Sequence, residues 1–221
     1  LEAVDELDVS YVSNISQFGD PDVVIIPGSK NTISDLLWMR QNGLEGKILR
    51  HAAKGGIVFG ICGGYQMLGQ SISDPTGAEQ KGTVRGMGLL PVTTVFEQEK
   101  RRTRVSGRFA KVGGALAEMS GVCYEGYEIH MGRTVLSKGT VPLVYMEEEG
   151  EQRQDGAQSD HVYGCYMHGI FDMSETVKTF LAAVLRKKGI DPSKITVRDR
   201  NAYKEEQYDR LASIVRENLN M

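Results

Sequence analysis

The chain has 221 residues, of which 40% are hydrophobic and 25% charged, which is ample for one globular domain and marginal for two. We therefore expect a single domain spanning residues 1–221. The net charge is −3 and Lys/Arg clusters are short, which argues against a nucleic-acid partner. No apolar run approaches the roughly 20 residues of a membrane span and no signal peptide is recognisable, so we expect no membrane association.

The cysteines Cys62, Cys123 and Cys165 show neither a pairing pattern nor CxxC spacing. This argues against a disulfide framework and a structural zinc site, and it favours a reducing, cytoplasmic location. We expect no bound metal. The chain begins Leu1-Glu2 without a methionine, which indicates either a trimmed chain or a piece of a longer polypeptide.

Short β-rich runs alternate with helical patterns in the first third of the chain, as is typical of an α/β protein with a parallel sheet. The predicted strands are 8–12, 23–26 and 57–61, and the predicted helices are 31–40 and 44–54.

The middle of the chain predicts hairpins added to the sheet, with extended segments at 89–96, 104–112, 122–129 and 143–146. The polar segment 147–160 is predicted to be a mobile hairpin tip or loop, followed by a core strand at 162–167.

The end of the chain is predicted to be helical. Ser174 could cap one helix, and a last helix carries Tyr208, Leu211, Val215 and Leu219 on one face.

Cys62 stands between glycines where the apolar run 57–61 ends and a helical pattern begins. A side chain at such a turn stands above the end of the sheet, and the first amides of the helix point towards it. These amides and the helix dipole favour a thiolate and could stabilise an oxyanion on a substrate carbonyl. The alternative is a small buried hydrophobic residue after a core strand.

Gly28 and Ser29 follow the buried strand 23–26 in the sequence Pro-Gly-Ser-Lys-Asn-Thr. The carboxyl ends of parallel strands form the ligand crevice of an α/β sheet, so these residues and Cys62 should face the same cleft. An ordinary strand–loop–helix connection is the alternative. A phosphate-binding P-loop does not fit, because Lys30 follows the glycine too soon.

His168 follows the aromatic-rich strand 162–167. A thiol that attacks an amide must lose a proton and the leaving ammonia must gain one, so an imidazole is the natural proton shuttle. We choose His168 for this role over His51, His130 and His161. The alternative for any single histidine is a structural role.

Five segments occur in the order found in the glutamine amidotransferase domain of the cobyric acid synthase family, which the chain resembles over nearly its whole length. They are residues 27–33, 60–69, 88–92, 126–134 and 168–172. The resemblance implies a class I, triad-type amidotransferase with a flavodoxin-like α/β fold: a mostly parallel sheet, flanking helices and added antiparallel hairpins.

By this resemblance Cys62 is the nucleophile, His168 is the acid–base, and the backbone amides of Ser29 and Gly63 form the oxyanion hole. Gly28 is expected beside the substrate.

Three further residues are expected to contact the substrate. Gln66 matches a position that contacts bound glutamine in related enzymes, although it could be a plain helix residue. Glu128 and His130 project to one face of a predicted strand. The resemblance favours glutamine binding or communication with another domain there, over a solvated face with a local ion pair.

Members of this family amidate several carboxylates of the corrinoid adenosylcobyrinic acid a,c-diamide with glutamine, ATP and Mg²⁺. Their amino-terminal half resembles a P-loop synthetase domain, and no Gly-x-x-x-x-Gly-Lys-Ser/Thr occurs in this chain. We therefore expect this domain to hydrolyse glutamine without a cofactor of its own. ATP and Mg²⁺ belong to the missing synthetase domain, which is its expected partner.

The chain departs from most class I enzymes at Ile170, where they carry a glutamate that orients the histidine. Asp172, Glu128 or a backbone carbonyl could orient His168 instead. Other possible functions are glutamine hydrolysis for cobyrinic acid a,c-diamide synthesis or for peptidoglycan glutamate amidation, a cysteine hydrolase or peptidase of similar fold, and a non-enzymatic subunit with an inactive cleft.

Overall fold

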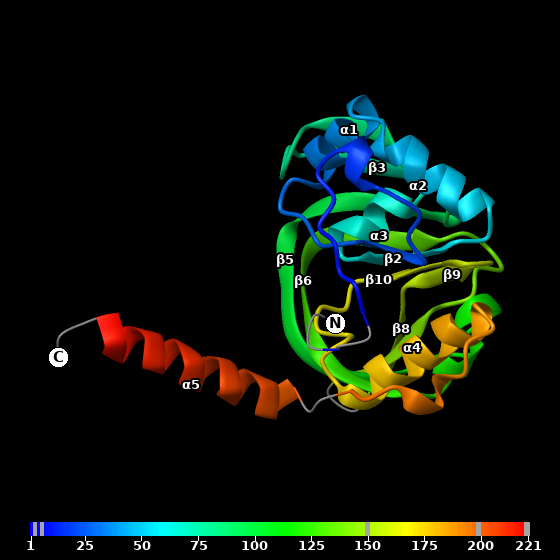
Figure 1. The fold of residues 1–221 in the computed structure, drawn as a ribbon. Helices are drawn as coiled ribbons and strands as arrows, with labels where there is room; N and C mark the ends of the chain where they lie inside the picture. Colours follow the sequence, from blue (N-terminus) through cyan, green and yellow to red (C-terminus); the bar gives the residue numbers. More distant parts are fainter. Residues whose placement is uncertain (2–3, 5–6, 149–150, 198–199, 219–221) are drawn as a thin grey trace.

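The computed structural model describes residues 1, 4, 7–148, 151–197 and 200–218 (Figure 1). The strands are β1 (Val23–Ile26), β2 (Ile57–Ile61), β3 (Ser71–Asp74), β4 (Gly82–Arg85), β5 (Val92–Phe109), β6 (Cys123–Leu136), β7 (Val144–Glu148), β8 (Glu151–Asp155), β9 (Ala157–Ser159) and β10 (Val162–Cys165). The α-helices are α1 (Thr32–Gln41), α2 (Leu44–Ala53), α3 (Gly63–Leu68), α4 (Ser174–Lys187) and α5 (Arg200–Asn218). Short 3-10 helices cover Ile15–Gln17, Gly114–Met119 and Pro192–Lys194.

A four-stranded sheet in the order β1-β2-β10-β9 carries the centre of the fold. β1 and β10 run parallel to β2, and β9 is antiparallel to β10. Alternate residues of β2 enter different cores: Ile57 and Phe59 pack with α4, whereas Val58 packs with α1. Because helices cover both faces of the sheet, the sequence of β2 is an uninterrupted apolar run. The carboxyl ends of β1, β2 and β10 therefore meet at one edge.

A second sheet has the order β4-β3-β5-β7-β8, with β6 also paired to β5. Two of its strands are longer than predicted, because segments 89–96 and 104–112 join in β5, and β6 continues to Leu136. Between the two β5 segments Glu97, Gln98 and Glu99 are polar and exposed, which an antiparallel ribbon tolerates since water can reach its faces. The pairing of β5 with β6 shifts register between Phe96 and Arg101.

The prediction of a mobile hairpin tip or loop over residues 147–160 was right that a hairpin lies there, since β7 and β8 pair antiparallel, but wrong that most of the segment lacks strands. Strands β8 and β9 lie there, while residues 149–150 lie outside the described part. Asp155 is buried, and the Arg153 guanidinium bonds to a fully buried carboxylate, so tertiary contacts order this polar sequence.

Two other local predictions were also wrong. Residues 8–12 form an exposed coil instead of a strand, because no described strand pairs with them. Ser174 is the first residue of α4, and Met173 is the N-cap residue, without a side-chain cap.

Helices α1 and α2 lie over one face of the four-stranded sheet and α4 over the other (Figure 1). Helix α5 extends away from this body, with Leu211 57% exposed, and Leu219 lies outside the described residues. Within the described residues, no helix combines the length and apolar character that a membrane crossing requires.

Candidate active site

Cys62 lies at the sharp turn between β2 and α3. Its φ of 52° and ψ of −109° are unusual for a residue with a side chain, and such strain is characteristic of a turn that raises a nucleophile above a sheet. The turn packs closely on β1: a Cβ on Gly64 would lie 2.0 Å from the carbonyl oxygen of Ile26. Only glycine therefore lets α3 approach β1 in this way.

The imidazole of His168 lies beside Cys62, next to Gly28. A Cβ placed on Gly28 would lie 2.8 Å from Cε1 and 3.7 Å from Nε2 of His168, and 3.5 Å from the Cβ of Cys62. The loop after β1, the elbow after β2 and the residue that follows the end of β10 thus meet at one edge of the parallel sheet. The Cys62 and His168 side chains therefore lie next to the same residue, Gly28.

The backbone amides of Ser29 and Gly63 lie close together at this edge of the sheet. A Cβ on Gly63 would lie 2.8 Å from the amide nitrogen of Ser29. Gly63 is also the first residue of α3, where a helix leaves its amides without partners inside the helix. Both amides are therefore candidates for an oxyanion hole, the Gly63 N–H being bonded to the Cys62 sulfur in the resting state.

The Cys62 thiol is 5% exposed, and its Sγ lies 3.7 Å from the carbonyl oxygen of Ile129, to which it donates a hydrogen bond. Burial raises the pKa of Cys62 to about 11; the hydrogen bond from the Gly63 amide lowers it less, and the charge of Glu79 raises it further. The resting group is therefore a thiol at neutral pH, so attack on a carbonyl requires a base.

His168 stacks on Tyr127 of β6, with ring centroids 5.1 Å apart and planes inclined by 7°. Its Nε2 is buried and has no hydrogen-bond partner among the described residues. Burial, and then the charge of His130, lower the pKa of His168. The ring is therefore neutral near pH 7 and able to accept a proton. Ile170, two residues further on, is buried in the core and offers no polar group.

Glu128 and His130 share a face of β6, as the alternation predicts, with Oε1 and Nε2 3.6 Å apart. The Glu128 carboxylate is fully buried and bonds to Arg101 Nε at 3.0 Å and Arg153 Nη2 at 2.6 Å. Burial alone would raise the pKa of Glu128, but His130 and Arg153 outweigh it and lower the pKa to about 2. Glu128 is thus a carboxylate held by cations and does not reach the His168 ring as its orienting partner.

His130 and Gln66 both contact Tyr166 behind the pocket. The His130 ring stacks on Tyr166 with centroids 3.7 Å apart, and its Nδ1 lies 2.8 Å from the Gly132 carbonyl oxygen. The buried Gln66 carboxamide donates a hydrogen bond to the Tyr166 hydroxyl at 3.1 Å. Tyr166 therefore joins α3 to β6 beneath the site.

Glu79 also reaches the site, which the sequence reasoning missed. The four amides of residues 77–80 donate to the buried Asp74 carboxylate, which fixes the loop after β3 over the start of α1. There Glu79 Oε1 accepts a hydrogen bond from the Thr32 hydroxyl at 3.2 Å, and Thr32 Oγ1 is 3.1 Å from the Cβ position of Gly63. Glu79 Oε2 is buried without a described partner, and burial raises the pKa of Glu79. The turn sequence Asp-Pro-Thr-Gly after a strand was the available signal.

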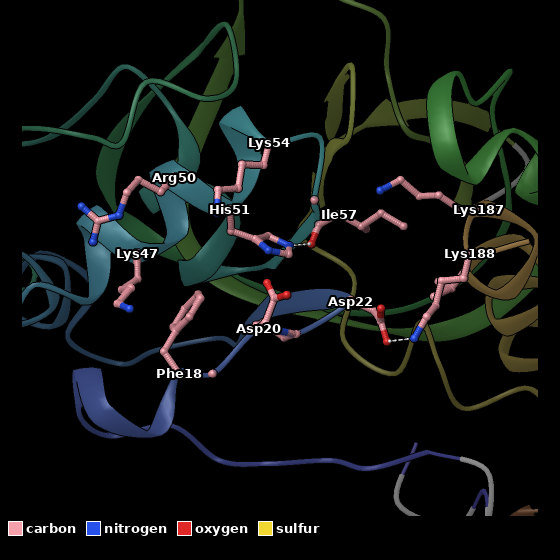
Figure 2. A pocket seen from close by; sticks show the side chains of 14 residues that line it. Phe18, Asp20, Asp22, Lys47, Arg50, His51, Lys54, Ile57, Lys187 and Lys188 are labelled. Carbon is pink, nitrogen blue, oxygen red and sulfur yellow. Dashed lines mark hydrogen bonds and ion pairs between the residues drawn. The ribbon is translucent and has the colours of Figure 1, made fainter.

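The remaining histidines lie at the opposite edge of the parallel sheet, where β2 begins. A pocket of about 330 Å³ lies at this edge, and His51 Nε2 there is 3.1 Å from the carbonyl oxygen of Ile57. The side chains that line this pocket are drawn in Figure 2. Lys188 pairs with Asp22 across it at 2.7 Å. His161 lies nearby, beside Gly55. Neither histidine can therefore reach the cysteine. Among the described residues, no three His, Cys, Asp or Glu side chains are grouped as metal ligands would be.

Comparison with known proteins identifies the family of this chain. Residues 1–176 match the CobB/CobQ-like glutamine amidotransferase domain family. A cobyric acid synthase of Ruminiclostridium cellulolyticum is 50% identical over all of this chain and 44% of its own length. A cobyric acid synthase of Lachnoclostridium phytofermentans is 42% identical over all of this chain and 45% of its own length. The chain thus spans less than half the length of these curated relatives.

Two solved structures share the fold. A glutamine amidotransferase crystal structure superposes with a TM-score of 0.57 at 16% identity, covering 83% of this chain and 88% of that one. The PurLQS structure from Thermotoga maritima gives a TM-score of 0.58 at 18% identity, covering 81% of this chain and 85% of that one. These likenesses confirm the α/β fold that the sequence predicted, with its parallel strands and flanking helices, although most of the antiparallel strands form a second sheet instead of extending the first.

Proposed function

Because the chain belongs to the CobB/CobQ-like glutamine amidotransferase domain family, we propose that it is the glutaminase domain of a cobyric acid synthase. It hydrolyses glutamine to glutamate and ammonia. A separate synthetase domain uses the ammonia, with ATP and Mg²⁺, to amidate side chains of adenosylcobyrinic acid a,c-diamide in cobalamin biosynthesis. The names of the relatives, and the fact that they are more than twice as long as this chain, support this assignment.

The observation that carries the proposal is that the Cys62 and His168 side chains both lie next to Gly28, with the Ser29 amide beside Gly63 at the start of α3. As sulfur attacks the γ-carboxamide of glutamine, neutral His168 takes the thiol proton. The Ser29 and Gly63 amides donate hydrogen bonds to the oxyanion that forms. Collapse expels ammonia, which takes the proton from His168, and leaves a γ-glutamyl thioester on Cys62.

Hydrolysis of the thioester completes the cycle. His168 deprotonates a water molecule, which attacks the thioester carbonyl, and then returns the proton to the leaving sulfur. The raised pKa of Cys62 and the lowered pKa of His168 favour a neutral resting pair, so the proton moves only as the sulfur–carbon bond forms.

We assign glutamine recognition to the residues around this pair. Gly28 leaves room for the substrate, and Gln66 and His130 line the inner side of the glutamine site. Glu128 acts through His130, because its own carboxylate is occupied by arginines. Glu79 is suited to the α-ammonium group of glutamine, since one buried carboxylate oxygen has no described partner.

The synthetase domain and its corrinoid substrate are the proposed partners, and this domain itself requires no cofactor. The described cysteines are free thiols, which fits a reaction in the reducing cytoplasm.

A pair of cysteine variants tests the proposal. Cys62→Ser is expected to lower glutamine hydrolysis by at least about 1000-fold with unchanged stability, because the exchange is nearly isosteric. The matched control Cys123→Ser changes an exposed free cysteine and is expected to retain full activity. Mass spectrometry after treatment with a glutamine-like diazo-ketone should find the label on Cys62 alone.

The full-length protein tests the cobalamin role. Cys62→Ser is expected to amidate the corrinoid with ammonium salt and ATP, but not with glutamine. Robust glutamine hydrolysis by Cys62→Ser would refute the nucleophile. Hydrolysis of peptides or esters in place of glutamine would instead indicate a cysteine hydrolase.

A further inference from the structure

No acidic side chain stands at position 170, two residues after His168, to orient the imidazole. Ile170 stands there and is 1% exposed within the core. The Glu128 carboxylate bonds to arginines. A free imidazole can rotate about its side-chain bonds, so a proton shuttle requires another constraint.

Tyr127 supplies two such constraints from β6. Its amide donates to the carbonyl of His168 at 3.0 Å, and the amide of His168 donates to the carbonyl of Tyr127 at 2.9 Å. This pair of hydrogen bonds fixes the backbone of His168 beside β6. The Tyr127 ring lies parallel to the imidazole, 5.1 Å away and inclined by only 7°, so it also restricts rotation of the imidazole plane.

We propose that Tyr127 is the positioning residue of His168, replacing the missing carboxylate by an aromatic stack. The inference rests on the proposed function, because it assigns Tyr127 to the proton shuttle of that reaction. The same stretch of β6 also holds the other reacting group, since the Ile129 carbonyl contacts the Cys62 sulfur at 3.7 Å. Residues 127–129 therefore align both halves of the catalytic pair.

Core packing does not account for the placement of Tyr127. Its side chain is 47% exposed, and its outer side borders an open hollow of about 1340 Å³. The rest of that hollow is lined by charged side chains, among them Arg104, Glu125 and Asp172, together with neutral polar and apolar ones. An exposed tyrosine on a ribbon gains little from burial, so its contact with His168 is its distinctive interaction.

Three variants test the inference. Tyr127→Leu is expected to lower kcat for glutamine about fivefold to tenfold, which lies within the range of one aromatic pair, with KM changed less than about twofold. Tyr127→Phe keeps the ring and is expected to stay within about twofold of the wild type. Tyr208→Leu is the matched control, because it makes the same exchange at an equally exposed tyrosine on α5.

Two further measurements do not depend on glutamine turnover. In the wild type and in Tyr127→Phe, ring current should shift the His168 ring protons upfield in the NMR spectrum, and Tyr127→Leu should lose this shift. Of the three variants, only Tyr127→Leu should show a slower alkylation of Cys62 by iodoacetamide at pH 7. The alkylation rate should fall by a factor similar to the decrease in kcat.

The possible outcomes separate the two proposals. If Tyr127→Leu loses the ring-current shift but keeps the wild-type kcat and alkylation rate, the stack is merely structural and the inference is overturned. An equal loss in Tyr127→Phe would overturn it as well. If the wild type hydrolyses no glutamine, the proposed function fails, while the alkylation rates still decide the role of Tyr127.

Discussion

Replacing Glu128 with glutamine probes the buried charges behind the catalytic pair. The Glu128 side chain is fully buried and bonds to Arg101 and Arg153, and its pKa is lowered from 4.5 to about 2. A shift of this size corresponds to about 3 kcal/mol of unfolding free energy at pH 7. Glutamine keeps the volume but not the charge, so Glu128→Gln is expected to lose about that amount.

The sign of the pH dependence follows from the lowered pKa. The carboxylate contributes its full stability above pH 4.5, and the contribution is lost as the pH falls towards 2. Urea unfolding should therefore separate wild type from Glu128→Gln by about 3 kcal/mol at pH 7 and by about half as much at pH 3.

A surface ion pair provides the control for this experiment. Glu97 lies 3.6 Å from Arg133, with side chains 52% and 72% exposed, so Glu97→Gln should change stability by less than about 0.5 kcal/mol. A loss below about 1 kcal/mol for Glu128→Gln at pH 7, or an equal loss at both pH values, would refute the reasoning.

Further predictions concern the pocket itself. Gly28→Ala should lower kcat about 100-fold or more in a folded protein, because its methyl group would lie 2.8 Å from Cε1 of His168 and displace the ring; a normal kcat would contradict the site geometry. Gly64→Ala should prevent stable folding, because its Cβ would meet the Ile26 carbonyl oxygen at 2.0 Å, and a thermal melt like that of the wild type would show that α3 does not pack so closely. In the pH profile of kcat/KM, activity should be lost on the acid side below pH 6.5 as His168 becomes protonated, because burial lowers the pKa of His168 from 6.5. Loss of activity already above pH 6.5 would exclude His168 as the base.

The sequence allowed prediction of those parts of the site that depend on short stretches of chain. Strands 23–26 and 57–61 were located to the residue, because a strand covered on both faces is a run of apolar residues bounded by turn signals. Cys62 and Gly28 follow these strands directly, so the topology of a parallel sheet placed them at one edge. His168 could be assigned to the same edge by the same argument.

The sequence reasoning missed strands in two polar segments and predicted one strand that does not form. Residues 97–104 and 151–159 contain few apolar side chains, yet they form parts of β5, β8 and β9. Residues 8–12 have a strand-like composition and form coil. Strand formation depends on a hydrogen-bonding neighbour, and such a neighbour comes from a distant part of the chain.

The apolar runs, the glycines at the turns and the order of the motifs determined the α/β core and the positions of the cysteine and the histidine, since each depends on neighbours in the chain. The tertiary structure alone decided what surrounds them: the stack of Tyr127 on His168, the approach of Glu79 to the pocket, and the arginines that hold Glu128. These contacts join residues that are 25 to 47 positions apart in the chain. Their energies arise from burial and charge in the folded chain, which no local pattern encodes.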